Sequence, residues 1–526
     1  MESGVADLLT AAVAREPGKI ALSEASTGRV LTWAALDELV ERVAGGLSGL
    51  GLVAGYRVMI AMTNRIEFVA AYLGILRAGM VAVPVNPRST TGELVRMLAD
   101  SGARVVFADP PTVPGVRAAV AGLSGAIAAS PGSAIPQPRV IAVGVPAESG
   151  EHAWEDVAAA GVAPVPVRDD PEALAVLLYT SGTSGRPRAA MLSHRALRAN
   201  IEQVAKVRPP MVIGQDVVLG VLPLFHVYGL NAVLGQVMRQ CARLVLVDGF
   251  DSEGSLDLIE DEAVSVVPVA PPVFAYWMQV PSLEERLGPV RLVLSGSAPL
   301  SGELTRSFVE RTGIPIHQGY GLTEAAPVVT STLCSAEPGP GTVGAALPGI
   351  ELRLTDDTGN PPEAEDEGEI WVRGDNLFSG YWPDGTDGPD EDGWFATGDV
   401  GYLDPDGDLY LVDRLKELVI VSGFNVYPSE VEDVIGELPE VSGVAVIGVD
   451  DARTGEAVVA YVTPAAHTDP ATLAALVTGH CGRRLARFKQ PSVVHVVEAL
   501  PYTVTGKVQK GRLRETERRR HLGLLE

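Results

Sequence analysis

The chain of 526 residues exceeds one ordinary domain and is 46% hydrophobic, so we expect at least two domains with large cores. Its formal net charge of −25 excludes nucleic acid as the main partner, because a nucleic-acid-binding face is basic. The acidity is better explained by solubility. Cys241, Cys334 and Cys481 are too scattered for a disulfide framework or a metal cluster. They are expected to be reduced thiols of a cytoplasmic protein.

No targeting or membrane-spanning segment is expected. The first 19 residues contain acids and lack a basic region followed by an apolar one, so they do not resemble a signal peptide. The longest uncharged stretch, residues 263–280, has the length of a membrane span. Pro268, Pro271 and Pro272 would break a spanning helix there, so a buried strand and turn are expected instead.

Helical and strand patterns alternate along the first three hundred residues, which predicts parallel sheets covered on both faces. Thr32 is the expected N-cap of the first of these helices. Residues 110–138 are rich in Ala, Gly, Ser and Pro and are expected to be a surface excursion. The expected helices cover residues 32–50, 67–77, 93–99, 194–207 and 230–239, and the expected strands cover 58–62, 80–85, 104–108, 174–179, 217–222, 243–247, 264–269 and 290–294.

The pattern changes from residue 341, where short strands alternate with turn signals such as Pro383-Asp384-Gly385. This predicts an antiparallel module within the same large domain. Residues 412–416 resemble a domain boundary, and a compact α+β segment follows. Its expected helices cover residues 430–437 and 472–485, its expected strands cover 444–449, 458–462 and 492–497, and its end is a basic tail.

A loop of small residues follows the expected buried strand 174–179, and it is the sequence's best candidate for a phosphate site. Glycines let the backbone approach an anion, hydroxyls add donors, and Arg186 and Arg188 add positive charge. A solvated Ser/Gly linker is the alternative, and neither GxxxxGK[ST] nor GxGxxG is matched. The loop residues are Thr180, Ser181, Gly182, Thr183, Ser184 and Gly185.

Three further candidates follow expected strands of the large domain. His226 lies beside apolar residues and is either a core histidine or a substrate contact. Glu324, next to Thr323, can supply oxygen to Mg²⁺ or serve as a surface or capping acid. Tyr320, between two glycines, can offer a flat face to a purine or pack in the core.

Two more candidates lie further along the chain. Asp399 can accept hydrogen bonds from two ribose hydroxyls, or be an ordinary turn aspartate. Lys507, after Thr505-Gly506, can reach a carboxylate and a phosphate together, or be a solvated lysine. Ligands of open parallel sheets bind at the carboxyl ends of strands. A phosphate loop, a Mg²⁺ acid and a ribose acid together indicate a bound nucleoside triphosphate.

The order of these motifs resembles the acyl-adenylate-forming superfamily over nearly the whole chain, most closely its fatty-acid and carboxylate–CoA ligases. YTSGTSGRPR resembles its phosphate loop, SGSAPL and QGYGLTEAAPV its adenine and Mg²⁺ segments, and LPYTVTGKVQK its catalytic-lysine loop. ATGDVGYLDPDGDLYLVDRLKELVIVSGFNVYPSEVE resembles its ribose motif, its hinge and the start of its C-terminal domain.

The resemblance implies an α/β fold. A large N-terminal domain, residues 1–413, would hold stacked, mostly parallel sheets with helices and a small antiparallel module. A small mobile α+β domain, residues 414–526, would carry the hinge near 414–416 and the lysine loop 501–510. The implied hinge residue is Lys416, and the implied CoA channel contains Ser422, Gly423 and Phe424.

The implied reaction joins a carboxylic acid to the α-phosphate of MgATP, releases pyrophosphate, and then passes the acyl group to a thiol. Lys507, Glu324, His226 and Thr180 would be catalytic, with Glu324 and Thr180 at the Mg²⁺. The implied ATP-binding residues are Thr180 to Gly185, Arg188, Ser297, Ala298, Gly319, Tyr320, Gly321, Leu322, Thr323, Asp399, Arg414 and Lys507. The implied acyl pocket contains His226, Tyr228, Ala232, Ala298, Gly319, Gly321, Pro327 and Val328.

One position departs from the family pattern. The phosphate loop usually ends in Pro-Lys-Gly, whereas this chain has Pro187-Arg188-Ala189. Arginine keeps the charge but presents a planar fork, so activity is expected to survive with altered pyrophosphate handling.

The resemblance also bears on substrates and partners. No aspartate lies near His226 to hold an ammonium group, and the pocket positions are small or apolar. A medium- or long-chain aliphatic or an aromatic acid is therefore expected, with ATP, Mg²⁺ and CoA. Two alternatives remain open: an acyl carrier protein takes the place of CoA, or the protein is a non-catalytic acyl- or nucleotide-binding relative. A homodimer is left open as well.

Overall fold

The structure is a computed structural model that describes residues 4–129, 137–159, 161–164, 169–180, 188–298, 300, 302–356, 359–362, 366–414, 417–421, 424–451, 454–503 and 506–521. These residues form two compact units. The first contains the described residues up to 180, those from 188 to 351, and 373–395. The second contains 352–372 and the described residues from 396 onward. The boundary expected at residue 414 stays a prediction.

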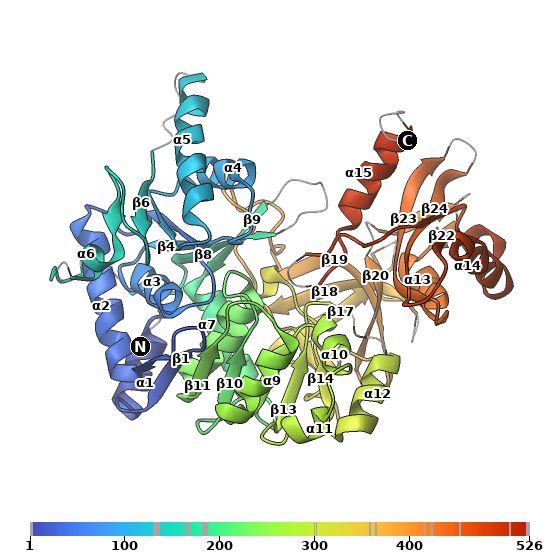
Figure 1. Cartoon of the computed structure of the whole chain (residues 1–526), viewed down its shortest axis with the longest axis horizontal. Helices are drawn as coiled ribbons and strands as arrows, with labels where there is room; N and C mark the ends of the chain where they lie inside the picture. Colours follow the sequence, from blue (N-terminus) through green and yellow to red (C-terminus); the bar gives the residue numbers. More distant parts are fainter. Residues whose placement is uncertain are drawn as a thin grey trace. The chain divides into compact units, whose positions relative to one another are not determined.

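Two seven-stranded, mostly parallel sheets form the framework of the first unit, which confirms the predicted α/β class (Figure 1). Only the edge pairs β1–β2 and β8–β9 run antiparallel in them. One sheet has the order β14 (Ile316–Gln318), β13 (Leu292–Ser295), β12 (Val266–Val269), β10 (Val217–Gly220), β11 (Arg243–Leu246), β1 (Ile20–Glu24), β2 (Arg29–Thr32). The other has the order β7 (His152–Ala153), β6 (Arg139–Ala142), β5 (Val105–Ala108), β3 (Arg57–Ala61), β4 (Val81–Pro84), β8 (Leu174–Thr180), β9 (Arg188–Ser193).

Helices separate most of these strands, as the alternating pattern predicts. A two-stranded sheet, β15 (Thr330–Ser331) with β16 (Ala345–Ala346), follows the last of them. The helices are α1 (Asp7–Arg15), α2 (Trp33–Gly49), α3 (Ile66–Arg77), α4 (Thr91–Ser101), α5 (Val113–Ala129), α6 (Trp154–Ala159), α7 (His194–Ala205), the π-helix η1 (Tyr228–Gly235), α8 (Gln236–Gln240), α9 (Ser252–Asp261), α10 (Pro272–Trp277), α11 (Leu283–Arg286), α12 (Gly302–Thr312) and the 3₁₀-helix η2 (Thr323–Ala325).

Local capping explains where two of the early helices begin. The Thr32 side chain accepts a hydrogen bond from the Ala35 N–H, which confirms it as the N-cap of α2. Helix α4 begins with a full capping box between Thr90 and Glu93. In both cases a short polar side chain satisfies backbone donors that the first helical turn leaves unpaired.

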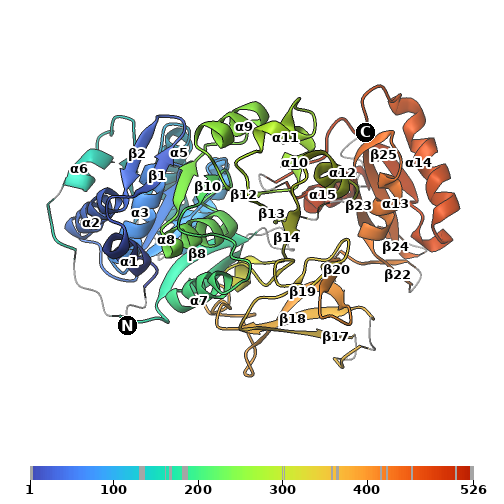
Figure 2. The same ribbon diagram turned by 90° about the horizontal axis from the view of Figure 1, so that it is seen from below.

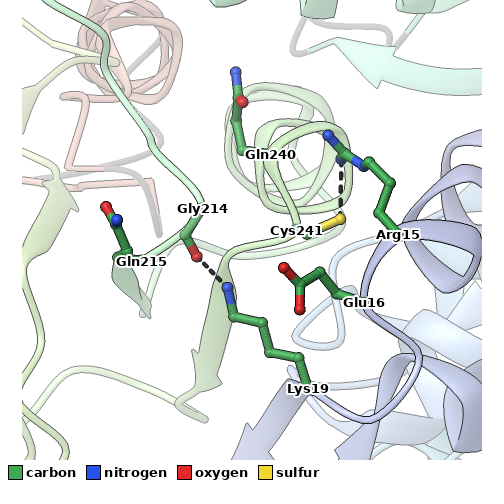
Figure 3. Close-up of a pocket in the computed structure, with 7 residues that line it drawn as sticks. All are labelled: Arg15, Glu16, Lys19, Gly214, Gln215, Gln240 and Cys241. Carbon is green, nitrogen blue, oxygen red and sulfur yellow. Dashed lines mark hydrogen bonds between the residues drawn. The ribbon is translucent and has the colours of Figure 1, made fainter.

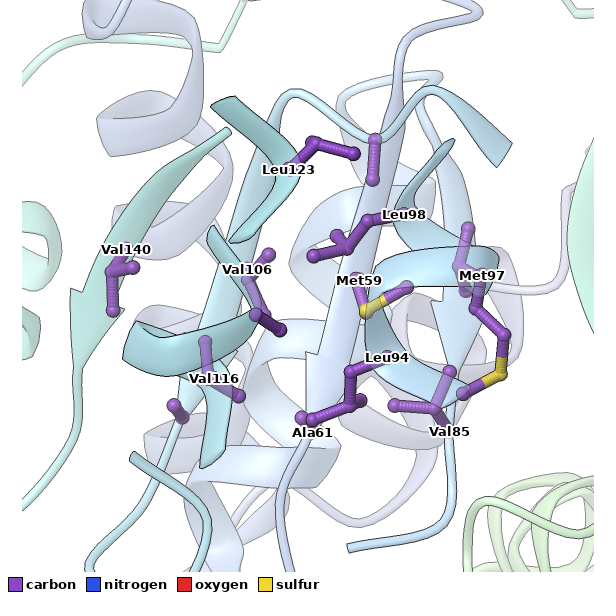
Figure 4. Packing of buried hydrophobic residues seen from close by; sticks show 14 of the residues in the cluster. Met59, Ala61, Val85, Leu94, Met97, Leu98, Val106, Val116, Leu123 and Val140 are labelled. Atoms are coloured by element: carbon purple, nitrogen blue, oxygen red, sulfur yellow. The ribbon is translucent and has the colours of Figure 1, made fainter. Parts of the chain in front are cut away.

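Helix α5 contradicts the expectation of a surface excursion at residues 110–138. Its Val116, Ala119 and Leu123 are buried and join a core cluster with Met59 and Val106 (Figure 4). The spacing of three and four residues puts these side chains on one helical face. Alanine is a strong helix former, so the same composition that resembles a linker also supports a helix.

The uncharged stretch 263–280 forms β12 and then α10, a short helix with a proline in its first turn in place of the expected turn. Phe274 packs edge-on against Phe308 with ring centroids 5.2 Å apart, and Trp277 donates a hydrogen bond to Ser255 Oγ at 3.0 Å. Figure 2 shows α10 and α11 beside β12 and β13. Within the described part of the chain, no helix is long and apolar enough to cross a membrane.

The second unit is built around antiparallel strands and three helices. The helices are α13 (Pro428–Gly436), α14 (Pro470–Arg484) and α15 (Lys510–His521), with the 3₁₀-helix η3 (Arg487–Lys489). Its first sheet has the order β17 (Ile350–Thr355), β18 (Gly368–Gly374), β19 (Trp394–Leu403), β20 (Leu409–Arg414). Its second has the order β22 (Phe424–Val426), β21 (Val419–Val421), β24 (Gly455–Pro464), β23 (Val441–Asp451), with β25 (Val493–Val496) also on β24.

The basic tail is an ordered helix, α15, because it has an apolar anchor and a polar one. Leu513 is buried beside Ala445 and Ile447 of β23. Tyr461 donates a hydrogen bond to Glu517, and Arg520 bonds both of these side chains.

The buried His194 at the start of α7 predicts a pH-dependent stability. Its Nδ1 accepts the Val5 N–H at 3.1 Å, and burial lowers its pKa from 6.5, with Arg198 lowering it and Asp7, Asp169 and Asp170 opposing. A lowered folded pKa means that the stability is fully present above pH 6.5 and is lost as the pH falls through the folded pKa.

We therefore expect the free energy of unfolding of the wild type to fall as the pH is lowered from the unfolded to the folded pKa of His194. In this window the fall should exceed that of His194→Gln by up to about 1.4 kcal/mol per pH unit. Urea unfolding from about pH 5 to about pH 8 measures this difference. The same pH dependence of the unfolding free energy in both proteins would show that the buried His194 does not contribute to it.

Candidate active site

The predicted phosphate loop begins and ends on paired strands. Thr180 ends β8, Arg188 begins β9, and the two residues face each other across the antiparallel pair. The Thr180 hydroxyl donates to the Arg188 carbonyl at 3.3 Å. Residues 181–185 lie outside the described residues, so the loop's phosphate-binding role stays a prediction.

His226 lies in a turn after β10 that a buried asparagine fixes. The Asn64 amide donates to the carbonyls of Gly220 and Leu222 at 3.0 and 2.9 Å, and its Oδ1 accepts the Leu224 N–H at 2.9 Å. The half-buried His226 accepts the Tyr228 N–H at Nδ1, at 3.3 Å. This hydrogen bond orients the imidazole ring within its own turn.

Tyr228 opens the π-helix η1, which also carries Ala232. Such helices are rare and occur frequently at functional sites. The Tyr228 ring lies against Gly296, where a Cβ atom would be 2.9 Å from Cε1. Burial raises the pKa of Tyr228, so its hydroxyl stays protonated at neutral pH. Ser297 and Ala298 follow directly, and Ser297 has a left-handed φ of 76°.

The segment 318–332 after β14 folds tightly back on itself and carries Glu324 with seven of the predicted nucleotide and acyl-pocket residues. A Cβ at Gly319 would lie 2.6 Å from the Thr330 carbonyl, and one at Gly321 would lie 2.4 Å from the Pro327 carbonyl. Tyr320 N–H donates to Thr330 Oγ1 at 3.2 Å. Only glycine allows the two limbs of this segment to lie so close. Tyr320 is 7% exposed, which fits the core alternative as well as a purine contact.

Three buried asparagines support the same segment from outside. The side-chain amides of Asn200, Asn231 and Asn376 donate to the carbonyls of Val328, Ala326 and Ala325 at 2.7, 2.6 and 2.7 Å. Asn200 Oδ1 also accepts the Val328 N–H at 3.1 Å. These bonds fix the backbone on the C-terminal side of Glu324, including the predicted pocket residues Pro327 and Val328.

Glu324 lies in η2 and is 9% exposed, which argues against the alternative of a surface acid. The Tyr381 hydroxyl donates to its Oε1 at 2.6 Å. Burial and then the Glu324 charge raise the pKa of Tyr381, which keeps the hydroxyl protonated as a donor. Arg188 lies over the Tyr381 ring, with its guanidinium carbon 3.8 Å from the ring centroid.

The donor set suits Mg²⁺ held together with phosphates. Mg²⁺ usually takes one or two carboxylates plus substrate oxygens, not a cage of protein ligands. Within the described ranges, no cluster of three His, Cys, Asp or Glu side chains could hold a metal by itself. The buried Glu324 carboxylate provides one hard oxygen ligand of the kind that this mode needs.

In the second unit, Asp399 and Arg414 are direct cross-strand partners on β19 and β20. Asp399 is 7% exposed, and its N–H donates to Thr397 Oγ1 at 3.1 Å. The neighbourhood of these two backbones agrees with the resemblance, while their contacts with a ribose stay predictions. The Arg414 and Phe424 side chains, and all of Lys416, Ser422 and Gly423, lie outside what the structure describes.

Lys507 is exposed on a short hairpin between β25 and α15. Thr503 N–H donates to the Lys507 carbonyl at 2.7 Å, and Lys507 N–H donates to Thr503 Oγ1 at 3.0 Å. Lys510, three residues on, pairs with Glu417 at 3.0 Å and with Glu432 at 2.9 Å. The hairpin is therefore fixed at its base while the lysine side chain projects from it.

Sequence reasoning missed Tyr381, Asp387 and the three asparagines. None of these residues belongs to a motif, and Tyr381 meets its partner Glu324 from 57 positions away. No local pattern marks such a contact. The sequence shows a glycine, Gly380, directly before Tyr381, and only the structure shows that its φ of 89° is left-handed.

A separate pocket of about 270 Å³ lies in the first unit, and none of the predicted site residues lines it (Figure 3). Arg15 donates to the Arg239 carbonyl at 2.7 Å and to Cys241 Sγ at 2.9 Å, and Lys19 donates to the Gly214 carbonyl. Arg15 therefore holds the end of α8, and Lys19 holds the loop before β10. Both cations of the pocket thus have a role in the fold.

Comparison with known proteins agrees with the motif order. The family model described as AMP-binding enzyme matches residues 9–382, and the one described as AMP-binding enzyme C-terminal domain matches residues 430–507. The chain is 34% identical to 4-coumarate–CoA ligase 5 of Oryza sativa subsp. japonica, over 94% of this chain and 90% of that protein. It is 32% identical to a long-chain-fatty-acid–CoA ligase of Bacillus subtilis (strain 168), over 98% and 94%.

Comparison with a solved structure shows that the fold is similar as well. ATP-bound MatB from Rhodopseudomonas palustris superimposes with a TM-score of 0.86 at 33% identity, covering 98% of this chain and 99% of that one. The first family model begins in the first helix and the second ends at Lys507, with residues 383–429 between the two matches. The chain therefore belongs to the AMP-binding enzyme family, the acyl-adenylate-forming superfamily that its motifs predict, and is an enzyme of the acid–thiol ligase class.

Proposed function

We propose that this enzyme activates a carboxylic acid with MgATP, giving acyl-AMP and pyrophosphate, and then transfers the acyl group to the thiol of CoA, releasing AMP. The buried Glu324 carboxylate, fixed by Tyr381 on the asparagine-braced segment, is the observation that carries the proposal. Relatives named as 4-coumarate and long-chain-fatty-acid CoA ligases support it.

In the first step, a carboxylate oxygen of the acid attacks the α-phosphorus of ATP, and the bond to the pyrophosphate oxygen breaks. Both reactants are anionic, so the site must offset their repulsion. Glu324 would hold Mg²⁺ on the phosphates, with Thr180 beside it, and Lys507 would neutralise charge on the attacking and phosphate oxygens. Asp399 would accept hydrogen bonds from the ribose hydroxyls.

In the second step, the CoA sulfur attacks the acyl carbonyl, and AMP leaves with the bonding electron pair. His226 would lie beside the acyl carbonyl, and the residues at 422–424 would line the thiol channel. Magnesium and a cytoplasmic location belong to this proposal as well.

The acyl pocket is proposed to take a medium- or long-chain aliphatic or an aromatic acid. The Tyr228 ring against Gly296 provides a flat, largely apolar wall whose hydroxyl stays neutral. Pro327 and Val328 add apolar surface on the braced segment. A substrate ammonium would find no aspartate beside His226 to pair with.

Removal of the Lys507 amine tests the first step. Lys507→Ala is expected to lower carboxylate-dependent exchange of pyrophosphate into ATP by about a hundredfold to a thousandfold, because an electrostatic contact made in the transition state is lost. Arg518→Ala, which removes an exposed cation from α15, is the matched control and should exchange like the wild type. Equal exchange by Lys507→Ala and the wild type would remove Lys507 from the mechanism.

The wall at Gly296 predicts a selective effect on the acid. Gly296→Ala must displace the Tyr228 ring, because its Cβ would lie 2.9 Å from Cε1. We expect the KM for the preferred acid, identified in the exchange assay across an acid panel, to rise about tenfold while the KM for ATP stays within about twofold. An equal rise in both values would place Tyr228 outside the acyl pocket.

The thiol acceptor is tested by AMP release from the preformed acyl-adenylate. Free CoA is expected to accelerate this release by at least about tenfold over water, since a thiolate is the stronger nucleophile. A phosphopantetheine-bearing acyl carrier protein is the comparison arm. Acceleration by the carrier protein without any by CoA would replace the CoA ligase with a carrier-loading ligase.

A further inference from the structure

Arg188, the departure from the family's phosphate-loop pattern, is part of a chain of four side chains that ends on Glu324. The members come from β9, from η2 and from the segment 381–387, and all belong to the first unit. Asp387 pairs with Arg188, Arg188 covers Tyr381, and Tyr381 bonds to Glu324. Tyr381 and Asp387 lie outside the sequence motifs and have no role in the proposed reaction.

The Tyr381 phenol is held from several sides. Its backbone bridges to Ala190 of β9 and to Thr386. Its ring meets the buried Phe378 edge-on, with centroids 5.0 Å apart. The phenol therefore approaches Glu324 from a fixed position, and its 2.6 Å hydrogen bond is short enough to be charge-assisted.

The Glu324 carboxylate needs such a fixed donor. The last torsion of a glutamate side chain is broad, so an unsupported carboxylate rotates easily. The hydrogen bond from Tyr381 goes to Oε1, and Oε2 receives none from the described residues. Holding one oxygen leaves the other pre-oriented as the ligand for a cation.

Arginine suits position 188 better than lysine would for holding the phenol. Its guanidinium carbon is 3.8 Å from the Tyr381 centroid, while Nη2 reaches Asp387 Oδ2 at 2.7 Å. A planar guanidinium can stack on a ring and donate in its own plane at once, whereas an ammonium is a point charge. Asp387 in turn holds this plane over the ring.

We infer that Tyr381 is a positioning residue that orients the Glu324 carboxylate for Mg²⁺, and that the Arg188–Asp387 pair acts through Tyr381 by clamping its ring. The inference rests on the proposed function, since it gives Glu324 the cation. It explains how a chain with arginine in the lysine position keeps an ordered metal ligand. The phosphates and Arg188 need no direct contact for this role.

Tyr381→Phe separates the hydroxyl from the ring. We expect calorimetric binding of ATP with excess Mg²⁺ to weaken about fivefold to tenfold, while ATP binding with excess EDTA stays within about twofold. Tyr461→Phe is the matched control, because it removes a tyrosine–glutamate hydrogen bond beside an arginine in the second unit. It should change neither affinity.

Loss of Mg²⁺-supported affinity in Tyr381→Phe alone supports the inference. Equal MgATP affinities in Tyr381→Phe and the wild type would overturn it, as would equal weakening of ATP with and without Mg²⁺. A thermal melt by circular dichroism accompanies each variant. If Tyr381→Phe did not fold, Arg188→Lys and Asp387→Asn would carry the same comparison.

The clamp has its own test in a double-variant cycle. Arg188→Lys and Asp387→Asn should each weaken MgATP binding about twofold to fivefold. Adding either to Tyr381→Phe should cause little further loss, because their effect passes through the missing hydroxyl. Additive losses, or weakened ATP binding in EDTA for Arg188→Lys, would mean that Arg188 contacts the phosphates directly and would overturn the clamp.

The wild type distinguishes this inference from the proposed function. If the wild type neither binds MgATP nor exchanges pyrophosphate with any acid of the panel, the proposed function fails and the inference with it. If the wild type does both and Tyr381→Phe matches it, only the inference fails.

Discussion

The site in the first unit depends on satisfying buried backbone carbonyls that no sheet pairs. Ala325, Ala326 and Val328 follow Glu324 in an irregular segment, and each carbonyl accepts a side-chain amide from a buried asparagine. Leaving one of them unpaired would cost about 1–3 kcal/mol. The amides come from α7, η1 and the loop after β18, so three separate parts of the unit must be in place before the segment is ordered. Glu324, Pro327 and Val328 acquire their positions from this network.

Much of the fold was predictable because its signals are local. The cap at Thr32 and the alternation of apolar strands with helices depend on neighbours within a few positions, and these features agree with the structure. Helix α5 was misjudged because composition does not separate an Ala-rich linker from an Ala-rich helix until a core receives its apolar face. The basic tail was not predicted to be a helix for a similar reason, because Leu513 packs on a strand more than sixty residues earlier in the chain.

The site was predictable only where motifs carry it. Glu324, Asp399 and Lys507 could be singled out because each lies in a recognisable motif, and their roles stay predictions. Tyr381 could not be singled out, because its importance comes from a contact between distant segments. Burial, which the sequence does not contain, argues against the surface-acid alternative for Glu324, while its role at Mg²⁺ stays a prediction. Arg188 also shows that contacts between distant segments cannot be predicted from the sequence. A substitution visible in the sequence acquired a physical meaning only when Asp387 and Tyr381 were seen beside it.

The ion pairs at the base of the lysine hairpin connect Lys507 to the core of the second unit. Lys510 joins Glu417 and Glu432, and Glu432 also accepts the Val446 N–H at 2.7 Å, so the hairpin is connected to α13 and β23. All three charged side chains are at least three-quarters buried. Flexing the hairpin alone would break a desolvated cluster, whereas rotating the backbone at one joint leaves the cluster intact. Any movement of the hairpin that keeps these ion pairs would therefore move α13 and β23 with it. Such a movement would cost the conformational entropy of a few backbone torsions and not that of a melted loop.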